Sequence, residues 1–171
     1  MNINRRLGRA RNTLAISPTR QSDVPLVVLW EKNELHVTHW SAEQHLKATS
    51  DTSIIHHMIF VKRSNVPVGY AVLKRNSPEE TSVEFLRLVI CDEFKSRGYG
   101  SLYFEHIWDL VFSEPGVERI WHDVFVDNHY AVHLYEKLGY ARLKEAADQV
   151  SGRALFFYEL TRQSYFARMA K

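Results

Sequence analysis

The sequence predicts an α/β domain built on a mixed sheet, with strands in both parallel and antiparallel pairs. Runs of branched and apolar residues alternate along the chain with segments whose apolar residues recur at helical spacing. In one example, the strand-like run 83–90 is followed by Ile107, Leu110 and Val111 on one helix face. The 171 residues, 45% of them hydrophobic, are enough to bury one sizeable core.

The first half of the chain is predicted to place two helices between strands. Ser22 or Asp23 caps the first helix, because its side-chain oxygen can accept hydrogen bonds from N–H groups of the first turn. Ser64 and Asn65 are turn residues between two apolar runs, which predicts a hairpin. The predicted elements are a strand at 13–17, helices from 22 or 23 to about 30 and at 42–48, and strands at 54–62 and 68–74.

The second half alternates strands and helices and ends in a hairpin. Asn128 is a good N-cap for one helix, and Gly139 stands where a helix C-terminus favours a residue at positive φ. Ser151 and Gly152 mark the turn of the closing hairpin. The predicted elements are a strand at 82–90, a helix at 99–112, a strand at 117–126, a helix at 129–138, and strands at 141–146 and 154–160.

Charge and composition exclude several classes of function. The 22 basic and 20 acidic side chains leave a formal charge of +2, which is too balanced for a nucleic-acid binder. No apolar run approaches the length of a membrane span, and Cys91 is the single cysteine, which fits a reducing compartment. We therefore expect a cytoplasmic protein with no nucleic-acid or membrane partner.

Basic residues gather at the start of the chain, where acidic residues are absent. We expect residues 1–12 to be a flexible basic N-terminus and residues 13–171 to form one domain. A targeting segment or a nucleic-acid-binding arm is the alternative for the four arginines, Arg5, Arg6, Arg9 and Arg11.

A candidate anion site lies in the segment 95–101, Lys-Ser-Arg-Gly-Tyr-Gly-Ser, between a strand and a helix. Unpaired N–H groups converge at a helix N-terminus, the helix dipole favours negative charge, and glycines let a phosphate approach the backbone. Lys95 and Arg97 add positive charge to the same turn. The alternative is an ordinary tight turn, because a G-x-G pattern alone is weak.

A second segment, 128–140, turns this pattern into a family resemblance. Its features are Asn128, the apolar stripe formed by Ala131, Leu134, Tyr135 and Leu138, and the closing Gly139-Tyr140. Together with Lys95, Gly98 and Gly100 of the first segment, it resembles the two acetyl-CoA motifs of the Gcn5-related N-acetyltransferase (GNAT) family. The resemblance covers about residues 56–160. It implies the acyl-CoA N-acyltransferase fold, a central twisted, mostly antiparallel sheet with a splayed strand pair, flanked by helices.

The resemblance also implies where acetyl-CoA binds. The pyrophosphate would lie on backbone amides from Arg97 to Ser101, and the pantetheine arm would pair with the preceding strand. Lys95 stands where the family has Arg or Gln, and Ser96 replaces a frequent Gly. The expected cofactor-binding residues are Leu88, Val89, Ile90, Lys95, Ser96, Arg97, Gly98, Tyr99, Gly100, Ser101, Asn128 and Tyr135.

Three side chains are candidates for the chemistry of acyl transfer. The resemblance implies that Tyr135 is the general acid that protonates the leaving thiolate, although an aromatic on this stripe can also be a core residue. Asp123 and Glu84 are alternative candidates for the base that deprotonates the amine. In a third alternative, water removes the proton without either carboxylate.

Other groups give weaker signals. His129 and His133 have a metal-chelating i, i+4 spacing but lack a third ligand, so we expect no metal. Cys91 is expected to be an ordinary thiol rather than a nucleophile. The resemblance places residues between the first two helices beside the acceptor, where they bind the amine or only pack; these residues are Trp30, Glu31, Glu34, His36, His39 and Trp40.

These observations together predict an acetyl-CoA-dependent N-acetyltransferase that works by direct transfer to a primary amine of a small molecule or a protein N-terminus. The segment 120–124 and the closing hairpin look most like the branch that acetylates protein N-termini, ribosomal proteins and polyamines. The alternative is a non-catalytic acyl-CoA-binding sensor on the same fold. The expected partners are acetyl-CoA and the amine, with the chain as a monomer or homodimer.

Overall fold

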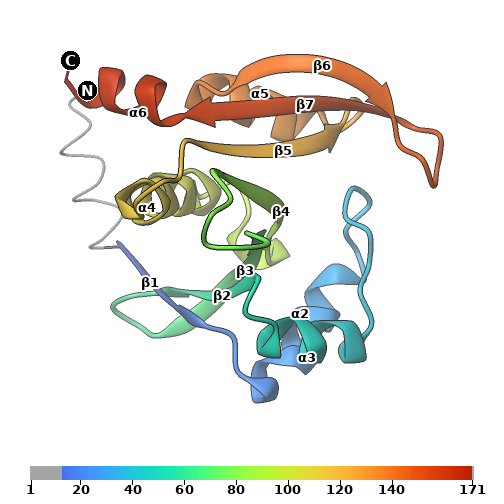
Figure 1. The fold of residues 1–171 in the computed structure, drawn as a ribbon. Coiled ribbons are helices and arrows are strands. Elements are labelled where there is room, and N and C mark those ends of the chain that lie inside the picture. Colours follow the sequence, from blue (N-terminus) through green and yellow to red (C-terminus); the bar gives the residue numbers. More distant parts are fainter. Residues whose placement is uncertain (1–12, 171) are drawn as a thin grey trace.

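A seven-stranded sheet runs through the whole molecule, and helices cover both of its faces (Figure 1). This computed structural model describes residues 13–170, so the predicted basic N-terminus, 1–12, lies outside the described residues. The strand order is β1-β2-β3-β4-β5-β7-β6. Among the strands of residues 13–170, only β4 and β5 pair in parallel, and every other neighbouring pair is antiparallel. The predicted mixed, mostly antiparallel sheet is therefore confirmed.

The elements of the first half agree with the sequence prediction to within a few residues. A short 3-10 turn precedes the first helix, and Ser41 caps the next one by accepting a hydrogen bond from the Gln44 N–H at 3.2 Å. Asn65 has a φ of 54°, a conformation that asparagine tolerates in turns. The elements are β1 (Leu14–Pro18), η1 (Gln21–Asp23), α2 (Val24–Glu31), α3 (Ala42–Ser50), β2 (Ile54–Val61) and β3 (Val66–Lys74).

In the second half, the sequence predicted every strand and both long helices but missed a C-terminal helix. Gly139 ends one helix at φ +83° and Asn128 caps it, as predicted. The missed helix buries only Tyr165, so its apolar pattern is weak. The elements are β4 (Ser82–Ile90), η2 (Asp92–Phe94), α4 (Tyr99–Ser113), β5 (Arg119–Phe125), α5 (His129–Leu138), β6 (Ala141–Ala147), β7 (Ala154–Thr161) and α6 (Arg162–Met169).

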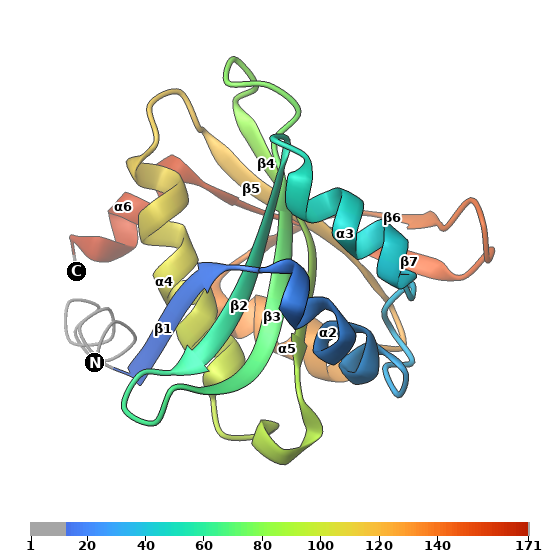
Figure 2. The same cartoon turned by 90° about the horizontal axis from the view of Figure 1, so that it is seen from below.

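The sheet separates two hydrophobic cores. Successive side chains of a strand point to opposite faces. Ile59 therefore joins the larger core with α4 and α5, whereas Met58 joins the smaller core with α2 and the loop that follows it. Figure 2 shows α2 and α3 beside the N-terminal strands and α4 crossing them behind β1. No helix within residues 13–170 is long and apolar enough to cross a membrane.

Buried histidines are a feature of this core that composition does not reveal. Burial lowers the pKa of His122 to about 3 and is the main cause that lowers those of His56 and His57 to about 3 and 4. His56 is further affected by the charges of His45 and Arg87. All three imidazoles are therefore neutral in the folded protein near pH 7.

We expect the folded protein to lose stability as the pH falls from about 6.5 to 4. In this range the unfolded chain binds protons that the folded chain excludes, so each histidine removes up to ~1.4 kcal/mol of unfolding free energy per pH unit. Urea titrations across this range measure the slope. In His122→Phe, the slope of unfolding free energy against pH should fall by the contribution of one histidine. In the control His133→Gln, at an exposed site, the slope should not change. An equal slope in His122→Phe would contradict this account.

Candidate active site

A β-bulge in β4 opens the centre of the sheet. On the β3 side, Leu73 pairs with Phe85 and Val72 with Arg87, which leaves Leu86 as an extra residue. A bulge bends its strand. On the β5 side, pairing stops just before this point, after Ser82↔Arg119, Val83↔Ile120 and Glu84↔Trp121. The remainder of β4 diverges from β5, as expected for a splayed pair, and one edge of its backbone faces the gap.

The predicted anion turn lies at the end of the diverging strand. Gly98 is the N-cap of α4 with φ +83° and has no side chain to satisfy the first helical N–H groups. The first intrahelical hydrogen bond runs from Leu102 N–H to the Gly98 carbonyl at 3.1 Å. The N–H groups of Tyr99, Gly100 and Ser101 therefore have no acceptor within the helix and can receive an anion.

The two glycines of this turn serve different purposes. Gly98 adopts the left-handed conformation that disfavours a side chain, although a Cβ there would meet nothing within 4 Å. A Cβ on Gly100 would make only ordinary contacts, 3.6 Å from Leu88 and 3.9 Å from Leu134. Gly100 is thus not required by local packing, and its missing side chain leaves space beside the helix N-terminus.

A cavity of about 470 Å³ lies between the diverging strands and the anion turn. This volume is within the usual range of small-molecule sites. Of the residues predicted for cofactor binding, Arg97 and Ser101 are not among its lining residues. Those that do line it are Leu88, Val89, Ile90, Lys95, Ser96, Gly98, Tyr99, Gly100, Asn128 and Tyr135.

Tyr135 lies on the wall of this cavity, with its ring against the aromatic core. Its ring centroid is 3.9 Å from that of His122 and 5.6 Å from that of Phe104. Burial, and then the nearby charge of Asp123, raises the pKa of the Tyr135 phenol well above its usual value. The hydroxyl is therefore protonated near neutral pH and can act as a hydrogen-bond donor, so one side chain combines the packing and donor roles.

The two candidate bases occupy different positions. Asp123 lines the cavity, whereas Glu84 does not. Asp123 is solvent-exposed at the cavity, but desolvation by the surrounding side chains raises its pKa, and the charge of Asp148 adds to this shift. Burial also raises the pKa of Glu84, although Lys74 opposes that shift. Both carboxyls are stronger bases than usual, but only Asp123 faces the cavity.

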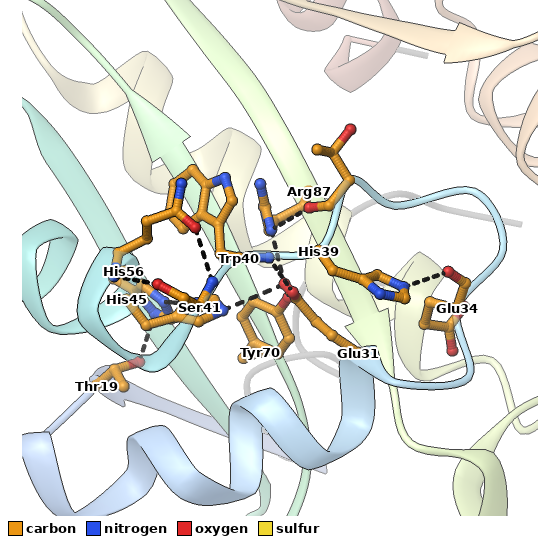
Figure 3. A network of polar contacts seen from close by, with 12 residues as sticks. Thr19, Glu31, Glu34, His39, Trp40, Ser41, His45, His56, Tyr70 and Arg87 are labelled. Carbon is orange, nitrogen blue, oxygen red and sulfur yellow. Dashed lines mark hydrogen bonds and ion pairs between the residues drawn. The ribbon is translucent and has the colours of Figure 1, made fainter. Parts of the chain in front are cut away.

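Glu31, which the sequence suggested for the acceptor side, instead lies at the centre of a buried polar cluster (Figure 3). One of its oxygens accepts a hydrogen bond from Arg87 at 2.7 Å and another from the Tyr70 hydroxyl, and the second oxygen accepts from Trp40 N–H at 2.8 Å. Burial alone would raise its pKa, but hydrogen bonds from His45, Tyr70 and Trp40, together with the Arg87 charge, lower it to about 2. Glu31 is therefore ionised near neutral pH and is a weaker base than an ordinary glutamate.

This cluster extends away from the cavity through two histidines. His45 Nε2 lies 3.4 Å from Glu31, His45 Nδ1 lies 3.0 Å from His56 Nε2, and His56 Nδ1 lies 2.8 Å from the Thr19 hydroxyl. Nothing in the sequence pattern links these four residues, because they come from four separate segments. The cluster holds α2 and α3 against the sheet beside the cavity.

The α2–α3 loop (residues 32–41) contacts both sides of the cavity. On one side Glu34 forms an ion pair of 2.6 Å with Lys95 of the anion turn. On the other side His36 lies 3.5 Å from Asp127, which binds Arg153 through both of its oxygens at 2.8 Å. The loop therefore bridges the two halves of the sheet.

The remaining candidates stand apart from this chemistry. Cys91 is buried, and burial raises the pKa of its thiol, which therefore stays protonated and unreactive. His129 and His133 lie on α5. Within residues 13–170, no group of three or more His, Cys, Asp or Glu side chains could hold a metal ion.

The candidate site is thus a cavity between splayed strands, with helical N–H groups open to an anion at one end and a tyrosine on its wall. A sequence profile described as the acetyltransferase (GNAT) family matches residues 22–140. The chain therefore belongs to the GNAT family and is an N-acetyltransferase. The GNAT family uses acetyl-CoA as co-substrate, and in this chain open helical N–H groups and a free strand edge face one cavity. No curated protein matches the chain significantly.

Solved structures of similar fold include two kinds of amine acetyltransferase. The dodecameric structure of a spermidine N-acetyltransferase from Vibrio cholerae has a TM-score of 0.77 and 18% identity, and the match covers 91% of this chain and 98% of that one. The ribosomal-protein-S18-alanine N-acetyltransferase from Escherichia coli has a TM-score of 0.72 and 17% identity, with coverage of 86% and 93%. Both names agree with the predicted polyamine and ribosomal-protein branch.

Ser96 has an unfavourable backbone conformation in the anion turn, with φ 60°. We expect Ser96→Gly to raise the free energy of unfolding by about 0.5–1 kcal/mol, because glycine has no steric penalty in this region. Urea denaturation measures the change. Asn65→Gly is the matched control at φ 54°, where asparagine is already tolerated, so its gain should be smaller. A loss of stability in Ser96→Gly would show that the serine side chain stabilises the turn.

Proposed function

We propose that this chain is an acetyl-CoA-dependent N-acetyltransferase that transfers the acetyl group directly to a primary amine of a small molecule or a protein N-terminus. One observation carries the proposal: a single cavity brings together the open N–H groups of the anion turn, the free edge of β4, Tyr135 and Asp123.

The first role of the site is to hold acetyl-CoA, which supplies the acetyl thioester. The N–H groups at the start of α4 and the Lys95 ammonium bind the phosphates, because helix N-termini and cations both favour an anion. The backbone edge of residues 86–90 pairs with the extended arm. A backbone N–H of this edge polarises the thioester carbonyl where negative charge develops.

The second role is to manage protons during direct transfer. The amine nitrogen forms a bond to the acetyl carbon as the carbon–sulfur bond breaks. Asp123 takes one proton from the protonated amine, directly or through water, which frees the nitrogen lone pair for attack, and its raised pKa makes it a better base than an ordinary aspartate. The second proton that the nitrogen loses as the amide forms balances the proton that passes from Tyr135 to the sulfur. Tyr135 donates its hydroxyl proton or a strong hydrogen bond to the leaving sulfur, so that no free thiolate has to accumulate.

Charge on the acceptor side supports an acceptor that arrives as a cation. Glu34, Asp123 and Asp148 all line the cavity. Carboxylates attract a protonated amine and raise its local concentration. The names of the two structural neighbours give spermidine and an alanine of ribosomal protein S18 as the groups that are N-acetylated. The acceptor class proposed here has the same chemistry.

An amine library incubated with acetyl-CoA, with free thiol as the readout, tests this function. An enzyme releases CoA only when a suitable acceptor is present. Acceptor-dependent thiol release supports the proposal and identifies the amine. If acetyl-CoA binds but no small amine or peptide N-terminus stimulates release, the chain is better described as a non-catalytic acyl-CoA sensor.

Tyr135→Phe separates packing from chemistry at the proposed acid. The variant keeps the ring against Phe104 and His122 and removes only the hydroxyl. We expect kcat to fall by roughly 10²-fold or more, the usual scale for a lost general acid. Affinity for acetyl-CoA and the melting temperature should hardly change. Full turnover in this variant would leave Tyr135 as a packing residue.

The pH–rate profile distinguishes the candidate bases. Asp123→Asn should lower kcat/KM and flatten the acidic limb, because that limb follows the titration of the carboxylate that accepts the proton. Glu84→Gln is the matched control, since Glu84 does not line the cavity, and should keep the limb. The reverse result would exchange the two roles. A wild-type profile in both variants would assign deprotonation to water.

A further inference from the structure

Lys95, the cation of the anion turn, is bound by two carboxylates. Its Nζ lies 2.6 Å from Glu34 Oε1 and 2.7 Å from Asp92 Oδ1. Asp92 lies three residues before it on the chain, whereas Glu34 comes from the α2–α3 loop, 61 residues away. The long-range pair therefore joins the cofactor side of the cavity to the acceptor side.

This ion pair conflicts with phosphate binding at the same turn. A phosphate that approaches the N–H groups of Tyr99 and Gly100 meets a lysine whose charge is already balanced, and it meets the Glu34 carboxylate, which lies 2.6 Å from that lysine and also lines the cavity. Like charges in a partly desolvated site repel each other. Phosphate and Glu34 are thus competitors for one ammonium group.

Glu34 can leave Lys95 without unfolding the loop that carries it. The loop backbone is held elsewhere, because Thr38 C=O accepts a hydrogen bond from Arg87 at 3.1 Å and Trp40 N–H donates one to Glu31 at 2.8 Å. The Glu34 carbonyl also accepts a hydrogen bond from His39 Nε2 at 2.8 Å (Figure 3). Only the Glu34 side chain needs to rotate, and a rotamer change of a partly exposed side chain is fast.

We propose that Glu34 and the cofactor's phosphates exchange on Lys95: the carboxylate occupies the lysine in the free protein and is released into the cavity when acetyl-CoA binds. This inference rests on the proposed function. The released carboxylate lies on the acceptor side, where it binds the ammonium group of a cationic amine. Cofactor binding therefore strengthens acceptor binding, and by the same coupling the acceptor strengthens cofactor binding.

The opposite arrangement makes the opposite prediction. If Glu34 instead holds Lys95 in position for the phosphate, then removing its charge weakens cofactor binding. If Glu34 and the phosphates exchange on Lys95, removing the Glu34 charge strengthens cofactor binding. The carboxylate then no longer competes for the lysine and no longer repels the phosphates. The sign of the effect in Glu34→Gln thus decides between the two arrangements.

Calorimetric titration with CoA, which binds without turnover, measures this sign. We expect Glu34→Gln to bind CoA roughly fivefold more tightly than the wild type, a change of the size typical of an exposed ion pair. The matched control is Glu43→Gln, which removes the same charge from an exposed site on α3 outside the cavity and should leave the affinity unchanged. Unchanged or weaker binding in Glu34→Gln overturns the exchange.

The coupling to the acceptor is measured with the amine identified in the thiol-release screen. In the wild type, saturating CoA should lower the Kd of that amine several-fold, and in Glu34→Gln this effect should disappear. Equal coupling in both proteins overturns the role of Glu34. Failure of the wild type to bind CoA at all would instead overturn the proposed function, and the exchange with it.

Discussion

The bulge at Leu86 is the constraint on which the rest of the site depends. One extra residue bends β4 away from β5 after three paired positions, and the sheet opens without losing its continuity. The gap exposes one backbone edge of β4 and directs the end of the strand toward the anion turn. A regular strand would pair with β5 along its whole length and leave no cavity.

The buried Glu31 cluster provides the rigid support beside this opening. A carboxylate deep in the protein is stable only with full hydrogen bonding and an opposite charge, and here Arg87, Tyr70 and Trp40 supply both. The same bonds fix the backbone of the α2–α3 loop. The loop can therefore present Glu34 and His36 to the cavity from a firm base, with freedom left mainly to the side chains.

The sequence was most informative where local rules decide the structure. The cap Asn128 and the terminator Gly139 defined α5, and the two glycines of the anion turn marked the start of α4, because caps and positive φ depend on neighbouring residues only. The sequence was less informative about α6, whose single buried residue gives no periodic signal. It also could not show that Ser96, at a position where the family often has glycine, adopts a positive φ.

The sequence by itself determined the order of the elements, the mixed sheet, the anion turn and the family resemblance, since each follows from residue type and spacing along the chain. Only the tertiary structure decided which polar side chains meet. It buried Glu31 with Arg87, placed Asp123 but not Glu84 on the cavity wall, and joined Glu34 to Lys95. The two residues of the Glu31–Arg87 ion pair are 56 residues apart in the sequence, and those of the Glu34–Lys95 pair are 61 apart. No periodic pattern encodes contacts over such separations.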